Sequence, residues 1–206
     1  MAEYYVPARD SETEFTEKRS RFIGHLWKVE TEEEAREKIA QMKAKYHDAR
    51  HNCWCYLLRE GNITRYSDDG EPQGTAGQPM LEVFRREGVE NVCCVVTRYF
   101  GGVLLGTGGL VRAYTAAASG ALQSAELVSM RLVVDCKVRV SYAQFEQAQR
   151  IIAAAETRLD EPIFDDAVTL CWRMPAGREE TLRTALNELT RGGAEVEISA
   201  PQYAAF

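Results

Sequence analysis

The spacing of apolar residues in the first 130 positions predicts a mixture of strands and helices. Residues 12–29 alternate loosely between apolar and polar side chains, which predicts two strands with a break near 18–20. Thr31 and Glu34 have the spacing of a capping box, so a helix is expected to begin there with Glu34 reaching back to Thr31. An apolar stripe follows on one face of that helix, formed by Ala35, Ile39, Met42 and Tyr46.

Further along, residues 52–58 and 63–66 predict a hairpin that turns at 60–62. A helix is predicted at 76–87. The unbroken apolar run within 91–100 is typical of a strand that is buried on both faces. A last helix is predicted from small and apolar residues at helical spacing, whose alanines would let it lie close to a sheet: Leu110, Ala113, Tyr114, Ala117, Ala121 and Leu122.

The pattern changes after about residue 130. The predicted elements are, in order, a strand at 134–140, a helix at 145–155, a hairpin that turns at 164–166, a strand at 168–174, a helix at 182–189 that ends at Gly192 and Gly193, and a strand at 194–198 with Ala194, Val196 and Ile198. This β-α-β-β-α-β order is the split βαβ or ferredoxin-like pattern. We therefore predict an α+β protein of two domains, 1–130 and 131–206.

Composition and charge limit the classes of protein that fit. Apolar residues make up 45% of the chain and charged residues 27%, which are ordinary globular values. The net charge is −6 and both predicted domains are acidic, which argues against a duplex-binding protein that relies on many phosphate contacts. A local cationic groove is still compatible with this net charge. We find no apolar signal region and no run near the roughly 18 apolar residues of a membrane span, so a cytoplasmic protein is expected.

The six cysteines contain no Cys-x-x-Cys pair and lie in apolar or alternating segments. We interpret them as reduced core residues and predict neither a disulfide framework nor a zinc site. No metal and no cofactor are expected. The six are Cys53, Cys55, Cys93, Cys94, Cys136 and Cys171.

Two segments, 67–77 and 97–109, concentrate the residues from which a site could be built, including eight of the fifteen glycines. Glycine is needed where the backbone takes a positive φ or where another group must come close to it. Asp68, Asp69 and Glu71 in the first segment could hold a divalent cation or act as acid and base. The simpler alternative is a turn in which aspartate accepts bonds from nearby amides.

The second segment places 101–109 between a buried strand and a helix that is expected to begin near Gly108. The free amides of a helix N-terminus suit an anion, although the P-loop lysine after Gly106 and the G-x-G-x-x-G pattern are both missing. Arg98 and Arg112 could fork onto a phosphate or carboxylate. The alternative for Arg98 is an internal ion pair with one of the three carboxylates. In either case we expect the two segments to meet, with Arg98 close to at least one carboxylate.

No catalytic set is recognisable, because no nucleophile elbow surrounds Ser67, Cys53 or Cys55. His51, beside Arg50 and Asn52, is the best-placed histidine. Aromatic residues near the glycines could stack on bases or simply pack in the core. The candidate binding residues are His51, Asp68, Asp69, Glu71, Thr75, Arg98, Tyr99, Gly101, Gly102, Thr107, Gly108, Gly109 and Arg112.

The two segments also carry a resemblance. Residues 66–79 read YSDDGEPQGTAGQP and residues 95–114 read VVTRYFGGVLLGTGGLVRAY. With these motifs, and with KRSRFI at 18–23 and DARHNC at 48–53, the chain resembles the IMPACT family, also called the YigZ or UPF0029 family. The resemblance covers the N-terminal domain, and the remainder looks like the extra domain of bacterial two-domain members.

The resemblance implies an N-terminal domain with the fold of the second domain of a small-subunit ribosomal protein, and a C-terminal domain similar to the last domain of elongation factor G. Eukaryotic members act in translational control by competing for the activator of a kinase that phosphorylates an initiation factor. Bacterial members lack that kinase pathway, and binding to nucleic acid or to the ribosome is expected of them.

We therefore expect a non-enzymatic, translation-associated binding protein whose partner is RNA, the ribosome or a translation-related protein, with no membrane association. The alternative is an enzyme that acts on a phosphorylated small molecule or nucleotide. In that alternative residues 106–109 would hold the phosphate, Arg98 would neutralise it, and Asp68 or Asp69 would serve as base or hold Mg²⁺.

Overall fold

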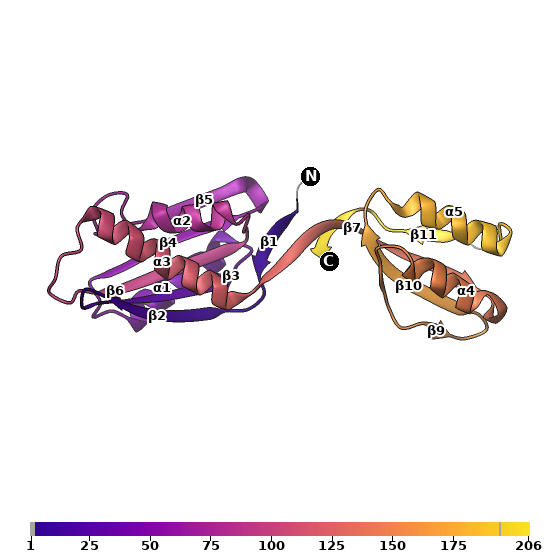
Figure 1. Ribbon diagram of the computed structural model, residues 1–206, viewed down its shortest axis with the longest axis horizontal. Coiled ribbons are helices and arrows are strands. Elements are labelled where there is room, and N and C mark those ends of the chain that lie inside the picture. Colours follow the sequence, from indigo (N-terminus) through magenta and orange to yellow (C-terminus); the bar gives the residue numbers. More distant parts are fainter. Residues whose placement is uncertain (1–2, 194) are drawn as a thin grey trace. The chain divides into compact units, whose positions relative to one another are not determined.

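A computed structural model describes residues 3–193 and 195–206 of the chain (Figure 1). The chain forms two compact units, Tyr4–Val128 and Ser129–Phe206, the second of which also takes in Glu3. Each unit packs helices against an antiparallel sheet, which confirms the predicted α+β class.

The first unit is built on a five-stranded antiparallel sheet in the order β2-β3-β6-β4-β5. Its strands are β2 (Ser11–Glu17), β3 (Ser20–Lys28), β4 (His51–Leu58), β5 (Ile63–Ser67) and β6 (Val92–Tyr99), and a short β1 (Tyr4–Pro7) precedes them. The central strand is β6, and every residue from Val92 to Arg98 is buried. This position in the middle of the sheet explains its unbroken apolar run.

Helices cover both faces of this sheet. The helix α1 (Glu32–Lys45) packs on one face with Trp27, Tyr56 and Val95. On the other face α2 (Gly77–Arg86) and α3 (Thr107–Ala125) share a core with residues such as Phe22. The helix α3 lies so close to β3 that a Cβ atom on Gly24 would be 2.9 Å from the carbonyl oxygen of Ala117. The alanine-rich face of α3 permits this approach.

The start of α1 differs in one detail from the predicted capping box. Thr31 Oγ1 accepts a hydrogen bond from the amide of Glu34 at 3.2 Å, as expected of an N-cap residue. The Glu34 carboxylate, however, accepts from the amide of Glu30 at 2.7 Å and not from that of Thr31. The helix therefore begins where predicted, with the glutamate bonded one residue further back.

Turns fall where the sequence predicts them in this unit. Lys18 and Arg19 take positive φ angles of 45° and 66° in the turn that joins β2 to β3. A short 3₁₀ helix, η1 (Glu60–Asn62), joins β4 to β5, and Gly61 has a φ of 69° there. Both hairpins are thereby closed by residues in the left-handed region.

The second unit has the predicted β-α-β-β-α-β order with additional short strands. Its elements are β7 (Leu127–Val140), α4 (Tyr142–Ala153), β8 (Arg158–Leu159), β9 (Ile163–Phe164), β10 (Val168–Pro175), α5 (Glu179–Thr190), β11 (Val196–Ile198) and β12 (Gln202–Ala205). The four main strands pair antiparallel in the order β11-β7-β10-β8, which is the arrangement of a split βαβ unit.

Three details of this unit bear on the sequence prediction. The strand β12 was not predicted and pairs with β7 at Met130–Val133. The first residue of the last predicted strand, Ala194, lies outside the described residues. The helix α5 ends as predicted, because Arg191 takes a left-handed φ of 54° and the Gly192 amide donates to the carbonyl oxygen of Asn187 at 2.9 Å.

Candidate functional site

The two glycine-rich segments meet on the face of the first sheet that carries α2 and α3. The first segment links β5 to α2 and the second links β6 to α3. Arg98, near the end of β6, places its Nη1 atom 2.7 Å from Oε1 of Glu71 in the first segment. The expected contact between Arg98 and one of the three carboxylates is therefore confirmed, and Glu71 is the residue that makes it.

Asp68 shapes the first segment. Its Oδ1 accepts hydrogen bonds from the amides of Ala76 (3.0 Å) and Gly77 (2.8 Å), and its Oδ2 accepts from the amide of Gly74 (2.8 Å). These bonds hold the loop closed and satisfy amides at the start of α2, whose own N-cap residue makes no side-chain bond. Asp68 therefore acts as the simpler alternative predicted, as an aspartate that accepts hydrogen bonds from nearby amides of its own turn.

Asp69 ties the same loop to the neighbouring strand and to α1. Its Oδ2 accepts from the amide of Asn52 at 2.7 Å, and its Oδ1 lies 2.7 Å from Nζ of Lys43. Its carbonyl oxygen is 2.9 Å from Nδ1 of His51. A carbonyl oxygen only accepts, so Nδ1 carries the proton and Nε2 is the ring nitrogen left to face other groups.

Glu71 and Arg98 form a buried ion pair, with 3% and 6% of their side chains exposed. Glu71 Oε1 also accepts from the hydroxyl of Tyr114 at 2.8 Å. Burial raises the pKa of Tyr114 far above its ordinary value, so this phenol donates in its neutral form. Arg98 Nη2 donates to Ser20 Oγ at 3.3 Å, while its Nε is buried and has no partner. The internal ion pair considered for Arg98 is the arrangement observed.

A cavity of about 380 Å³ opens beside this ion pair. It is lined by Arg50, His51, Glu71, Pro72, Arg98, Phe100, Leu104, Leu105, Gly106, Thr107 and Leu110. The helix α3 begins at this cavity with Gly106 as N-cap residue, and no side chain caps its first turn. The helix starts one residue earlier than the expected Gly108. Four of the predicted binding residues thus share one cavity: His51, Glu71, Arg98 and Thr107.

The other predicted residues are not among those that line this cavity. Tyr99 is directed differently, since its hydroxyl donates to Asp48 at 2.7 Å and its ring lies under Arg21. Thr75 donates to the carbonyl oxygen of Pro72 within its own loop. Asp68 and Asp69 make the side-chain hydrogen bonds described above. Gly101 and Gly102 lie in the loop after β6, Gly108 lies in the first turn of α3, and Gly109 lines a second cavity.

Arg112 lines a different cavity, of about 260 Å³, together with Phe15, Glu17 and Lys18. Arg98 and Arg112 therefore do not face one common cavity. Arg98 reaches the start of α3 from the sheet, whereas Arg112 lies on the side of the β2–β3 turn, with the end of its side chain near Gly108.

Gly101 has a structural role in the second segment. A Cβ atom at this position would lie 1.9 Å from the carbonyl oxygen of Arg19, so the β2–β3 turn and the loop after β6 are in direct backbone contact. Its amide also donates to Ser20 Oγ at 3.4 Å. Only glycine fits this approach without a shift of one segment.

The candidate binding residues did not include several residues that line the cavity, among them Arg50, Phe100 and Leu104, although Phe100 is one of the aromatic residues expected either to stack on bases or to pack in the core. Arg50 directly precedes His51 at the start of β4 and is exposed. Phe100 is 41% exposed and Leu104 82% exposed. Leu104 lies between Gly102 and Gly106 and continues no strand or helix pattern, which was the available signal for this residue.

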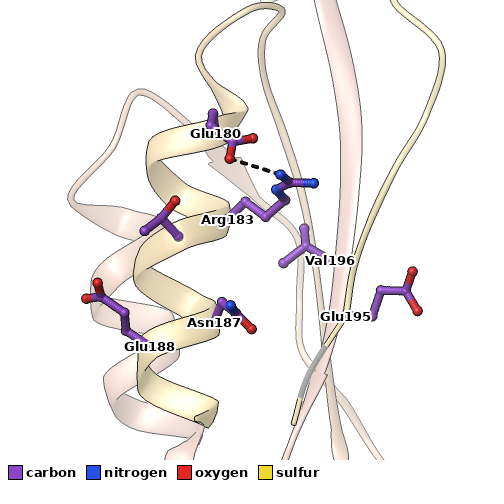
Figure 2. Close-up of a pocket in the computed structure, with 7 residues that line it drawn as sticks. Glu180, Arg183, Asn187, Glu188, Glu195 and Val196 are labelled. Carbon is purple, nitrogen blue, oxygen red and sulfur yellow. Dashed lines mark hydrogen bonds and ion pairs between the residues drawn. The ribbon is translucent and has the colours of Figure 1, made fainter. Parts of the chain in front are cut away.

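A second surface hollow lies in the C-terminal unit, between α5 and β11 (Figure 2). Its volume is about 440 Å³, and its lining mixes Glu180, Arg183, Asn187, Glu188 and Glu195. Arg183 donates to Glu180 at 2.9 Å, as the dashed line in Figure 2 shows. Charges that are paired on an exposed helix face, with no buried polar group, are the ordinary pattern of a solvated surface.

Neither a metal site nor a membrane-spanning helix is present in the described part of the chain. Residues 3–193 and 195–206 contain no group of three or more His, Cys, Asp or Glu side chains arranged to hold a metal ion. No helix among these residues is long and apolar enough to cross a bilayer. All six cysteines are free thiols, and only Cys171 is not fully buried.

Comparison with known proteins matches both units to protein families. The family model described as Impact N-terminal domain matches residues 18–122, and one described as Domain of unknown function (DUF1949) matches residues 138–192. The IMPACT family member YvyE of Bacillus subtilis is 34% identical over 201 residues, which cover 97% of this chain and 93% of that protein. The chain belongs to the IMPACT family.

Other members extend this comparison. The IMPACT family member YigZ of Escherichia coli is 30% identical, with 95% of this chain and 98% of that protein covered. Protein IMPACT of Oryctolagus cuniculus is 30% identical over 105 residues, which are 49% of this chain and 33% of that protein. A solved structure described as "Crystal structure of an hypothetical protein" has a TM-score of 0.60 at 30% identity, covering 95% of this chain and 97% of that one. The bacterial members therefore match along both units.

Proposed function

We propose that this IMPACT family protein is a non-enzymatic, translation-associated regulatory protein that docks onto RNA of the ribosome through the cavity between its two glycine-rich segments. The observation that carries the proposal is the lining of that cavity, where Arg50, His51 and Arg98 face the uncapped start of α3. Cationic side chains and free helix amides together suit a phosphate group. A role at the ribosome places the protein in the cytoplasm.

The charges of the site support a modest, local interaction with phosphate. Glu71 offsets the charge of Arg98, so Arg50 is the lining cation without a carboxylate in the cavity to oppose it. The chain as a whole carries a net charge of −6. Association should therefore weaken with salt as expected for about one or two phosphate contacts, far fewer than in a basic RNA-binding domain.

The engagement of the acidic residues supports binding over catalysis. Both carboxylate oxygens of Asp68 accept backbone amides, and both oxygens of Asp69 are bonded to Asn52 and Lys43. A general base or a Mg²⁺ ligand needs a carboxylate oxygen that can reach the substrate or the ion. The two residues that the enzymatic alternative requires are thus occupied within the fold.

One observation favours an enzyme of phosphorylated small molecules as the second candidate. The cavity volume of about 380 Å³ falls in the size range of small-molecule sites. A thermal-shift screen of nucleotides and sugar phosphates, with and without Mg²⁺, tests it, because a ligand that binds only the folded state raises the melting temperature. Product formation from a compound that shifts the melting temperature would favour the enzyme.

Co-sedimentation with ribosomes over a salt series tests the leading proposal. The wild-type protein should pellet with ribosomes at low salt and be released as salt is raised. Arg50→Ala should reduce the pelleted fraction at every salt concentration. Arg86→Ala, which removes an exposed arginine of α2 away from the cavity, should leave it unchanged. Absence of ribosomal association at low salt would contradict the proposal.

A further inference from the structure

We infer that the cavity takes one phosphorylated nucleotide, either free or at the 5′ end of an RNA strand, with its phosphate at the start of α3 and its base against Phe100. The inference rests on the proposed function where it takes RNA as a source of the nucleotide. The lining of the cavity combines cationic and apolar side chains, and each kind suits one part of such a ligand.

The residues proposed to hold the phosphate come from three parts of the fold. The 19-residue helix α3 brings Gly106 and Thr107 to the cavity without a capping side chain, and β4 brings Arg50 and His51. Because Nδ1 of His51 donates to the Asp69 carbonyl oxygen, Nε2 is the nitrogen left to face other groups, and it lies 3.9 Å from Oε1 of Glu71. Arg98 from β6 is only 5% exposed, lines the same cavity, and has an Nε atom without a partner. The feature is therefore a built pocket and not a helix terminus alone.

The balance of charge among the lining residues favours an anion. The single carboxylate that lines the cavity is Glu71, and it lies 2.7 Å from Arg98. Arg50 is then left without an opposing charge among the residues that line the cavity. A monophosphate carries the one to two negative charges that match this lining.

The rest of the lining is apolar and includes an aromatic ring. Phe100 is 41% exposed, and the guanidinium of Arg98 lies 5.5 Å from its ring centroid. Pro72, Leu104 and Leu105 complete this wall. Any base can stack on an exposed aromatic ring, because every base has a flat π-face. Inorganic phosphate would leave this wall uncovered, and an apolar ligand would leave the cations unpaired.

The size of the cavity restricts the ligand to one nucleotide unit. A volume of about 380 Å³ lies in the lower part of the range for small-molecule sites, so it suits a single nucleotide better than a continuous strand. A nucleotide within a strand carries chain on both sides, whereas a terminal or free one leaves at least one side without chain. The proposed ligand is therefore a free nucleotide or the nucleotide at the 5′ end of a strand.

Isothermal titration with adenosine monophosphate, adenosine and inorganic phosphate tests the cationic and the apolar parts of the lining separately. Adenosine monophosphate should bind more tightly than either of its parts. Arg50→Ala and Phe100→Ala should each weaken it by about tenfold. The matched controls Arg86→Ala and Tyr66→Ala, which remove an exposed arginine and a 48% exposed tyrosine outside the cavity, should not. Leu104→Ser, at an 82% exposed position, tests the apolar wall should Phe100→Ala prove less stable.

Short RNAs of one sequence with a 5′-phosphate or a 5′-hydroxyl distinguish the sources. Tighter binding of the phosphorylated strand, with displacement by adenosine monophosphate, assigns the site to RNA ends. Binding of adenosine monophosphate without this preference supports a free nucleotide and contradicts the use of the cavity for RNA. If no nucleotide binds while ribosomes still pellet the protein, the inference is wrong and the proposed function stands. Phosphate binding as tightly as adenosine monophosphate would also overturn the inference.

Discussion

At the scale of single residues, the ion pair between Arg98 and Glu71 lines the cavity and joins the two glycine-rich segments. Both side chains are almost completely buried, and Tyr114 and Ser20 supply their remaining bonds. A buried charge is tolerated because its partner is present, so removal of one partner costs much more than the pair gains.

Arg98→Ala is therefore expected to destabilise the first unit by about 3–5 kcal/mol, because it leaves the Glu71 carboxylate buried without a cation. Urea unfolding of the variant and the wild type measures this. The double variant Arg98→Met/Glu71→Gln should lose less than Arg98→Ala, since no charge is stranded. An unchanged melting temperature with lost ribosome binding would show instead that Arg98 acts on the ligand and that the fold does not depend on it.

The cysteines are the second residue-scale prediction. Burial raises the pKa of Cys93 to about 12 and that of Cys136 to about 11, so both are protonated and unreactive at neutral pH. Ellman titration at pH 8 should label the folded protein slowly, with Cys171 first, and should reach six thiols after unfolding without reductant. A final count below six would reveal a disulfide and contradict the expectation of a reduced protein.

At the scale of elements, the second glycine-rich segment is held in place by contact with the β2–β3 turn. Gly101 lies directly against the backbone of Arg19, and this contact fixes where the loop leads into α3. Gly108 has no such constraint, because a Cβ atom there would meet only the end of the Arg112 side chain at 3.6 Å. The two glycines thus have different physical reasons to be present.

Gly101→Ala should lower the stability of the first unit by about 2 kcal/mol or more, since the added methyl group forces two backbone segments apart. Gly108→Ala, within a helix, should leave stability unchanged or raise it slightly. Thermal melts of the two variants beside the wild type give the comparison. Equal melting temperatures for both variants would mean that the contact at Gly101 relaxes at no cost.

At the scale of the whole molecule, each unit has its own core. The apolar clusters of the first unit lie on the two faces of its five-stranded sheet, whereas Trp172, Leu170 and Leu186 belong to a separate cluster in the second. Every residue that lines the proposed nucleotide cavity falls between Arg50 and Leu110. The site therefore depends on one unit only.

A chain that ends at residue 130 is accordingly expected to fold and to retain the nucleotide affinity of the full protein. Cooperative unfolding of this fragment in calorimetry and an unchanged dissociation constant for adenosine monophosphate are the results to look for. The Arg50→Ala change in the fragment should reproduce the loss seen in the full chain. A fragment that folds but binds much more weakly would show that the second unit contributes to the site.

The sequence by itself determined the elements and the family. The apolar run of β6, the helical stripe of α1 and the turn residues at Lys18 and Gly61 each act through neighbours close in the chain, so their patterns can be interpreted locally. The order of elements in the second unit followed from the same periodicities. The likeness of the two units to domains of a ribosomal protein and of elongation factor G stays a prediction.

The sequence predicted that Arg98 meets one of three carboxylates, and the tertiary structure alone decided which one. Asp68, Asp69 and Glu71 are adjacent in sequence and chemically alike, yet one binds loop amides, one binds Asn52 and Lys43, and one meets Arg98. These partners come from distant elements, and loop conformation selects among them. The strand β12 escaped prediction for a related reason, since its position depends on pairing with β7. Apolar periodicity reports which face is buried, but contacts between side chains depend on how loops and strands are brought together in three dimensions.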